Sequence, residues 1–190
     1  MSLPDLLQPP QAAAVVLGTG LILLLSRRSL RHPRSHGFWR MFAFEGLLLL
    51  VVLVAPVWFH RPLAPRQVAS WLLLVASAAL ALHAVRLLHT AGRPAAGAGA
   101  EPDLHWERTT ALVTSGAYRW IRHPMYASLL LLAAGTVLKA VTVTSVLLGL
   151  GIALALALTA RADEAETAAR FGTAYAEYRA RTSMFIPRLL

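Results

Sequence analysis

MFAFEGLLLLVVLVAPVWF, residues 41–59, is the stretch of sequence that decides the fold. Glu45 is the one charged side chain in it. As an α-helix with a rise of about 1.5 Å per residue, the stretch reaches about 28 Å, close to the thickness of a bilayer core. No alternating β-barrel pattern accompanies it, and a backbone in hydrocarbon must pair its own polar groups. The stretch therefore predicts a transmembrane helix.

Further apolar blocks follow the same pattern along the 190 residues. Of the whole chain, 57% is hydrophobic and 14% charged, against about 45–50% and about 25% in soluble domains. The blocks at 41–59, 67–88 and 140–160 are long enough to span a bilayer, whereas those at 11–25 and 125–138 are shorter and are expected to tilt or to stop at an interface. The sequence predicts an all-α integral membrane protein with about five transmembrane helices.

Basic residues report the orientation of these helices. Asp5 and no basic residue precede the first block, and Arg27 and Arg28 follow it, which is the reverse of a secretory signal. Of the 18 Lys and Arg residues, fifteen lie in connections on one side and three on the other. The positive-inside rule then places the N-terminus outside and the C-terminal tail in the cytoplasm. The net charge of +9 is a topology signal, and no nucleic-acid partner is expected.

The chain contains no Cys and no Asn. The lack of Cys excludes disulfides, thiolate metal sites and a cysteine nucleophile. His83, Arg86 and His89 recur at a spacing of three near the end of the third block, without the carboxylates that a metal site needs. They line a polar cavity or face lipid head groups. No metal is expected. Glu45 is either a functional acid within the membrane or a partner of Arg40.

The first candidate site is LVTSGAYRWIRHPMY, residues 112–126. Gly116 suits a tight turn, and Pro124 suits the first position of the next helix. Arg122 and His123 then lie at a helix N-terminus, where an anion is favoured. The alternative is that Arg122 only anchors the helix at head groups. An isolated Arg-His-Pro also occurs at 31–33, so the longer string carries the information.

The second candidate site is ADEAETAARFGTAYAEYRARTSMFIP, residues 162–187, which we expect to be helical up to about Ala180. Glu164, Phe171, Tyr175 and Tyr178 are spaced by 7, 4 and 3 residues. On one continuous helix they would share a face. This face either packs into a core or binds a polar or cationic ligand beside the membrane.

Together these two stretches resemble the cofactor motif of the isoprenylcysteine carboxyl methyltransferase family. The resemblance covers about residues 109–188. It implies an integral membrane, multi-pass enzyme that uses S-adenosylmethionine, located in the plasma or inner membrane if the source is bacterial, with its active site facing the cytoplasm. It also implies three parts: a transmembrane scaffold (1–90), a cytoplasmic linker (91–108) and a catalytic region (109–190), whose C-terminal helix completes the cofactor pocket.

The resemblance further implies roles for individual residues. Arg122 and Arg181 would orient the carboxylate of the acceptor, and Glu164 would belong to both the catalytic and the cofactor sets. The acceptor would be lipophilic and similar to prenylcysteine. The remaining cofactor-binding positions are Gly116, Tyr118, His123, Pro124, Tyr126, Tyr175 and Tyr178.

Physical chemistry supports a carboxylate acceptor and leaves alternatives open. A carboxylate is already ionised at neutral pH, and orientation alone supplies about 7–11 kcal/mol of a displacement barrier. N-methylation of a phospholipid amine would need a base such as Glu164 or Glu45, and S-methylation of a small thiol is a further alternative. A non-catalytic membrane subunit or a small transporter would bind no S-adenosylmethionine. The sequence gives no indication of the oligomeric state.

Overall fold

The computed structural model describes residues 8–92 and 110–188. Within these ranges the chain is helical, and its one β feature is an isolated parallel bridge between Ile121 and Ser183. Most of the expected linker at 91–108, and Asp5 of the orientation argument, lie outside the described residues. The elements are α1 (Pro9–Ser26), η2 (Ser29–Arg31), α2 (His36–Val54), η3 (Ala55–Val57), α3 (Pro65–Thr90), η5 (Gly116–Arg119), α4 (Pro124–Val137), α5 (Val143–Phe171) and α6 (Thr173–Ala180).

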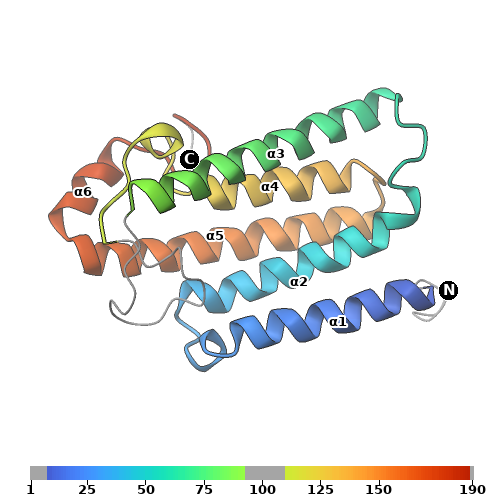
Figure 1. Cartoon of the computed structure of the whole chain (residues 1–190), viewed down its shortest axis with the longest axis horizontal. Coiled ribbons are helices and arrows are strands. Elements are labelled where there is room, and N and C mark those ends of the chain that lie inside the picture. Colours follow the sequence, from blue (N-terminus) through green and yellow to red (C-terminus); the bar gives the residue numbers. More distant parts are fainter. Residues whose placement is uncertain (1–7, 93–109, 189–190) are drawn as a thin grey trace.

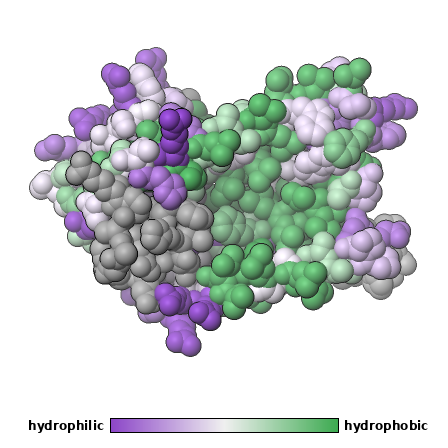
Figure 2. All heavy atoms as spheres, viewed as in Figure 1, coloured by the Kyte–Doolittle hydropathy of each residue, from purple (hydrophilic) through white to green (hydrophobic). Residues whose placement is uncertain are grey.

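Four of the described helical segments are long and apolar enough to cross a membrane: Pro9–Ser26, His36–Val57, Pro65–Thr90 and Val143–Phe171. The fifth apolar helix, α4, has 14 residues and a length of roughly 21 Å, which is less than a bilayer core. In Figure 1 these helices run side by side along the long axis, with η5 and α6 together at one end. Apolar side chains cover much of the middle of the molecule in Figure 2, and hydrophilic ones gather towards its ends. The prediction of an all-α membrane protein is confirmed.

Local sequence signals set where the helices begin. Pro124 is the first residue of α4, as predicted. Before α5, Thr142 and Ser145 form a reciprocal capping box, which satisfies N–H groups that have no partner inside the helix. The Ser35 hydroxyl accepts the N–H of Phe38 at the start of α2. These signals fix where α2, α4 and α5 begin.

Small residues let the helices approach closely. A Cβ added to Gly46 of α2 would lie 2.7 Å from a side-chain carbon of Ile152 on α5. Between α3 and α4, the Ser70 hydroxyl donates to the Gly135 carbonyl and the Ser77 hydroxyl to the Ser128 carbonyl, both at 2.7 Å. Close packing and hydroxyl hydrogen bonds of this kind hold helices together in lipid, where the hydrophobic effect does not favour association because the lipid tails are equally apolar.

The end of the bundle away from α6 is closed by Lys139, in the connection between α4 and α5. Its side chain is 1% exposed, and its Nζ atom lies 3.4 Å from the centre of the Trp71 ring and 5.5 Å from that of Trp58. The Gln67 amide donates to the Lys139 carbonyl at 3.0 Å. A close cation–π contact with Trp71 therefore ties this connection to α3, and a longer one with Trp58 ties it to the connection between α2 and α3.

The C-terminal helical segment is broken, which corrects one prediction. The expected continuous helix up to Ala180 ends at Phe171, and α6 begins at Thr173. Between them Gly172 has φ +54° and ψ −126°, a conformation that side chains with a Cβ rarely adopt. Glu164 and Phe171 are therefore on α5, and Tyr175 and Tyr178 are on a second helix. Their spacing of 7, 4 and 3 does not define one helical face.

Candidate active site

The first motif enters the site through a turn held against α3. Gly116 has φ +57°, and a Cβ there would lie 2.7 Å from His83 Nε2 and 2.6 Å from a Leu87 methyl. The next residue, Ala117, donates its N–H to His83 Nε2 at 3.3 Å. The predicted tight turn at Gly116 is present. His83, which is itself exposed, supports the turn through this contact.

Backbone hydrogen bonds join the two motifs. The Arg122 and His123 N–H groups donate to the carbonyls of Ser183 and Met184, at 2.8 and 3.2 Å. In return the Ser183 N–H donates to the Trp120 carbonyl at 3.2 Å. This short parallel pairing places the residues that precede α4 directly against those that follow α6. The structure thus brings together two stretches that are about sixty residues apart.

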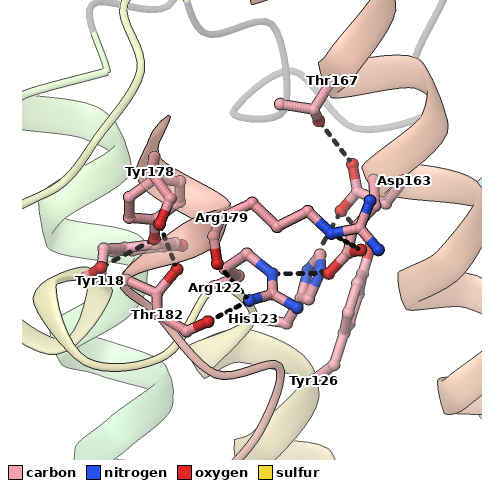
Figure 3. A network of polar contacts seen from close by, with 10 residues as sticks. Tyr118, Arg122, His123, Tyr126, Asp163, Thr167, Tyr178, Arg179 and Thr182 are labelled. Atoms are coloured by element: carbon pink, nitrogen blue, oxygen red, sulfur yellow. Dashed lines mark hydrogen bonds and ion pairs between the residues drawn. The ribbon is translucent and has the colours of Figure 1, made fainter. Parts of the chain in front are cut away.

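Arg122 is the centre of the polar network in Figure 3. Its Nε donates to Glu164 Oε1 at 2.6 Å, and its Nη1 donates to the carbonyls of Thr182 and, at 3.4 Å, Arg179. The side chains of Arg122 and Glu164 are 9% and 6% exposed. Glu164 therefore neutralises Arg122, and the two residues fasten the end of α6 to α5.

His123 lies between two carboxylates. Its Nε2 is 3.3 Å from Glu164 Oε1, and its Nδ1 is 3.6 Å from Asp163 Oδ2. The Tyr126 hydroxyl donates to the same Asp163 oxygen at 3.2 Å, and the rings of His123 and Tyr126 stack 5.4 Å apart at 19°. The Asp163 side chain is 31% exposed and that of Glu164 only 6%. Asp163 is thus the acid that a ligand reaches more readily.

Tyrosines of η5 and α6 form the next layer. The buried Tyr178 hydroxyl donates to the Tyr118 carbonyl at 2.7 Å. Tyr175 is 3% exposed, and its hydroxyl has no hydrogen-bond partner among the residues that the structure describes. Burial raises the pKa of all three phenols above the ordinary value, so they stay neutral at physiological pH. An unsatisfied buried hydroxyl costs about 1–3 kcal/mol, so a bound group that pairs with the Tyr175 hydroxyl would remove this cost.

A hollow of about 470 Å³ lies beside this network. Two predicted site residues line it: Tyr178, which was expected to bind the cofactor, and Arg181, which was expected to orient the acceptor. Arg119 was not among the predicted site residues. The hollow is lined by Thr114, Arg119, Trp120, Tyr178 and Arg181.

The predicted residues therefore divide into groups. Arg122, His123, Tyr126 and Glu164 meet in one network, while Arg181 lies at the hollow. Tyr118 and Tyr178 meet through a hydrogen bond. Gly116 and Pro124 shape the backbone.

Sequence reasoning noted Asp163 only as the first member of an acidic pair with Glu164 and gave neither Asp163 nor Arg119 a role in the site. Both stand directly beside a predicted residue, Glu164 and Tyr118 respectively, and this adjacency was the available signal. Elsewhere, Glu45 accepts a hydrogen bond from Thr19 at 2.5 Å. No cluster of three or more metal-ligating side chains occurs in residues 8–92 and 110–188.

Comparison with known proteins identifies the segment that carries most of this network. Residues 95–169 match the model of the isoprenylcysteine carboxyl methyltransferase family. This range includes Arg122, His123, Asp163 and Glu164, and ends before α6. Searches of curated proteins and of solved structures gave no significant match. The predicted resemblance is confirmed over residues 95–169, which match the isoprenylcysteine carboxyl methyltransferase family, and this match supports a membrane methyltransferase in general.

Proposed function

We propose that the protein transfers a methyl group from S-adenosylmethionine to the carboxylate of a lipophilic, isoprenylcysteine-like acceptor. The observation that carries the proposal is the juxtaposition of Asp163 and Glu164 with His123 and Tyr126. A family match over the same segment supports it. The site would face the cytoplasm, with the N-terminus outside, because the basic residues concentrate in the connections on that side.

The residues fit the chemistry of the cofactor. S-adenosylmethionine is a sulfonium that also carries an ammonium group and hydroxyls. Asp163 is a partly exposed acid that would favour a cationic group, and the buried, stacked rings of His123 and Tyr126 hold its carboxylate from below through their polar atoms. The Tyr175 hydroxyl would gain the hydrogen-bond partner that it lacks. When bound, the cofactor supplies an electrophilic methyl group.

Glu164 has a supporting role in this proposal. Since Arg122 and His123 already occupy its carboxylate, it holds those two residues in place and binds the cofactor through them. The region 109–190 would be the catalytic region and 1–90 the scaffold, with α4 as a fifth, shorter apolar helix in the bundle. A methyl acceptor with a lipid tail gives a reason for placing the reaction in the membrane.

The first test is calorimetric binding of S-adenosylmethionine and its demethylated product to the detergent-purified protein. Wild type should bind both saturably. Glu164→Ala should weaken binding more than tenfold, and Arg181→Ala should leave cofactor affinity unchanged while impairing use of the acceptor. Glu164→Ala leaves the buried Arg122 unpaired, at a cost of about 3–5 kcal/mol, so Asp163→Asn serves as a gentler second variant with the same expected direction.

The matched control is Arg161→Gln, which changes an exposed charge on α5 outside the site. Folded protein that binds neither compound would favour the non-catalytic alternative. For N-methylation of an amine, the rate should depend steeply on the pH at which a base ionises; a flat profile around neutrality supports the carboxylate acceptor.

A further inference from the structure

The connection between α1 and α2 carries the densest positive charge in the described structure. Four exposed arginines lie within eight residues: Arg27, Arg28, Arg31 and Arg34. No Asp or Glu occurs anywhere in residues 8–44. Like charges held this close repel one another and destabilise the compact state. An anion from outside the protein would offset that repulsion.

The other arginine-rich part of the molecule is balanced from within the chain. Residues 161–181 hold four arginines and also four acids. By contrast, Arg27, Arg31 and Arg34 form no ion pair and donate no side-chain hydrogen bond within the part of the chain that the structure describes. The guanidinium groups of these three residues are therefore available to a ligand.

Local hydrogen bonds give this connection a defined shape. The His32 N–H donates to the carbonyl of the buried Ser29 at 2.9 Å, which closes the turn of η2. At the start of α2, the His36 N–H donates to Glu166 Oε1 of α5 at 2.9 Å, and His36 Nδ1 lies 2.7 Å from Glu166 Oε2. Glu166 is thus occupied by His36. In Figure 1 the connection lies at the same end of the bundle as η5 and α6. The arginines are displayed from an ordered turn that is fastened to α5.

The neighbouring apolar side chains set the depth of these arginines in a membrane. Leu24 and Leu25, in the last turn of α1, are 58% and 53% exposed, and α1 is long and apolar enough to span a bilayer. Leu30, between the arginines, is 38% exposed as well. Arginines that directly follow an exposed apolar turn extend their guanidinium groups to the level of the lipid head groups. The anion that fits this place is therefore one with apolar chains.

We propose that the connection between α1 and α2 binds the phosphate groups of anionic phospholipids through Arg27, Arg31 and Arg34. A guanidinium group donates two parallel N–H bonds to phosphate oxygens. Three of them favour a lipid with a net negative charge over a zwitterionic lipid, whose own ammonium group is repelled. The binding belongs to the folded protein, so it goes beyond the part that basic residues play in orienting helices during insertion. It does not depend on the methyltransferase proposal.

The test compares two lipids that differ only in the head group. Phosphatidylglycerol and phosphatidylcholine with identical acyl chains are titrated into the delipidated, detergent-purified protein, and bound lipid is counted by native mass spectrometry. Wild type should bind phosphatidylglycerol at least about tenfold more tightly. The triple variant Arg27→Gln, Arg31→Gln, Arg34→Gln should lose this preference, and the same three positions changed to Lys should keep most of it. The control removes the same charge elsewhere on the exposed surface and should keep the preference: Arg66→Gln, Arg86→Gln, Arg161→Gln.

Further measurements identify the source of the anion. Glycerol phosphate, which carries the phosphate without the chains, should not displace the lipid, and raising the salt from about 0.05 M to about 0.5 M should weaken the preference. Equal binding of the two lipids by wild type overturns the inference. So does a preference that survives the Gln triple variant, that the Lys variant loses, or that the control loses equally. Displacement by glycerol phosphate would indicate a site for a soluble anion and overturn the assignment to lipid.

Discussion

Tyr175 and Tyr178 lie three residues apart on α6, yet their hydroxyls differ in a way that can be measured. Tyr178 donates to the Tyr118 carbonyl, whereas the Tyr175 hydroxyl is buried without a partner in the described structure. Tyr178→Phe should therefore lower the free energy of unfolding by about 0.5–1.5 kcal/mol. Tyr175→Phe should leave it unchanged or raise it, and should weaken S-adenosylmethionine binding. Thermal unfolding in detergent and calorimetry check the pair; a larger stability loss in Tyr175→Phe would contradict the assignment.

The dependence of thermal stability on alkaline pH is a second measurable property of Tyr175 and Tyr178. Burial raises the pKa of both phenols in the folded protein, while the unfolded chain keeps the ordinary value of about 10. The stability that they contribute is thus fully present below pH 10 and is lost as the pH rises towards the folded value. The melting temperature should fall above pH 10, and should fall less in Tyr175→Phe.

At the scale of elements, the break at Gly172 decides where α6 lies. Its φ of +54° with ψ −126° is a backbone conformation that residues with a Cβ rarely adopt, although a Cβ at this position would meet no atom within 4 Å. Gly172→Ala should cost about 1–3 kcal/mol through backbone strain alone and should loosen the packing of α6, read by near-ultraviolet circular dichroism.

Gly151 is the matched control for that substitution. It lies inside α5, and a Cβ there would also meet no atom within 4 Å. Because its backbone is helical, Gly151→Ala should stabilise the helix by up to about 1 kcal/mol. An equal loss in both variants would show that the Gly172 conformation is not what places α6.

At the scale of the whole molecule, the orientation of the bundle is testable because the chain has no Cys. Leu63, in the connection between α2 and α3, is 87% exposed, and Ala91 at the far end of α3 is exposed as well. In intact cells an impermeant maleimide should label Leu63→Cys and should label Ala91→Cys only after permeabilisation. The reverse pattern would invert the bundle and place the site outside.

The parts of this molecule that sequence predicts are those set by local physics. The length of residues 41–59 requires a membrane helix, and Pro124 begins α4, because both follow from neighbouring residues alone. The partner of Arg122 could not be predicted, since Glu164 is 42 residues away and competes with any ligand for the same guanidinium. The prediction that Glu164, Phe171, Tyr175 and Tyr178 share one helical face was wrong. The spacing argument assumed one continuous helix, whereas the helix ends at Gly172.

The pairing of Arg122 and His123 with Ser183 and Met184 also has a consequence for biosynthesis. A ribosome synthesises the first motif before the residues that must lie against it. A nascent chain halted ahead of Ser183 can insert every apolar helix and still lack the backbone partner of its first motif. Such a chain lacks the backbone hydrogen bonds that hold the two motifs together.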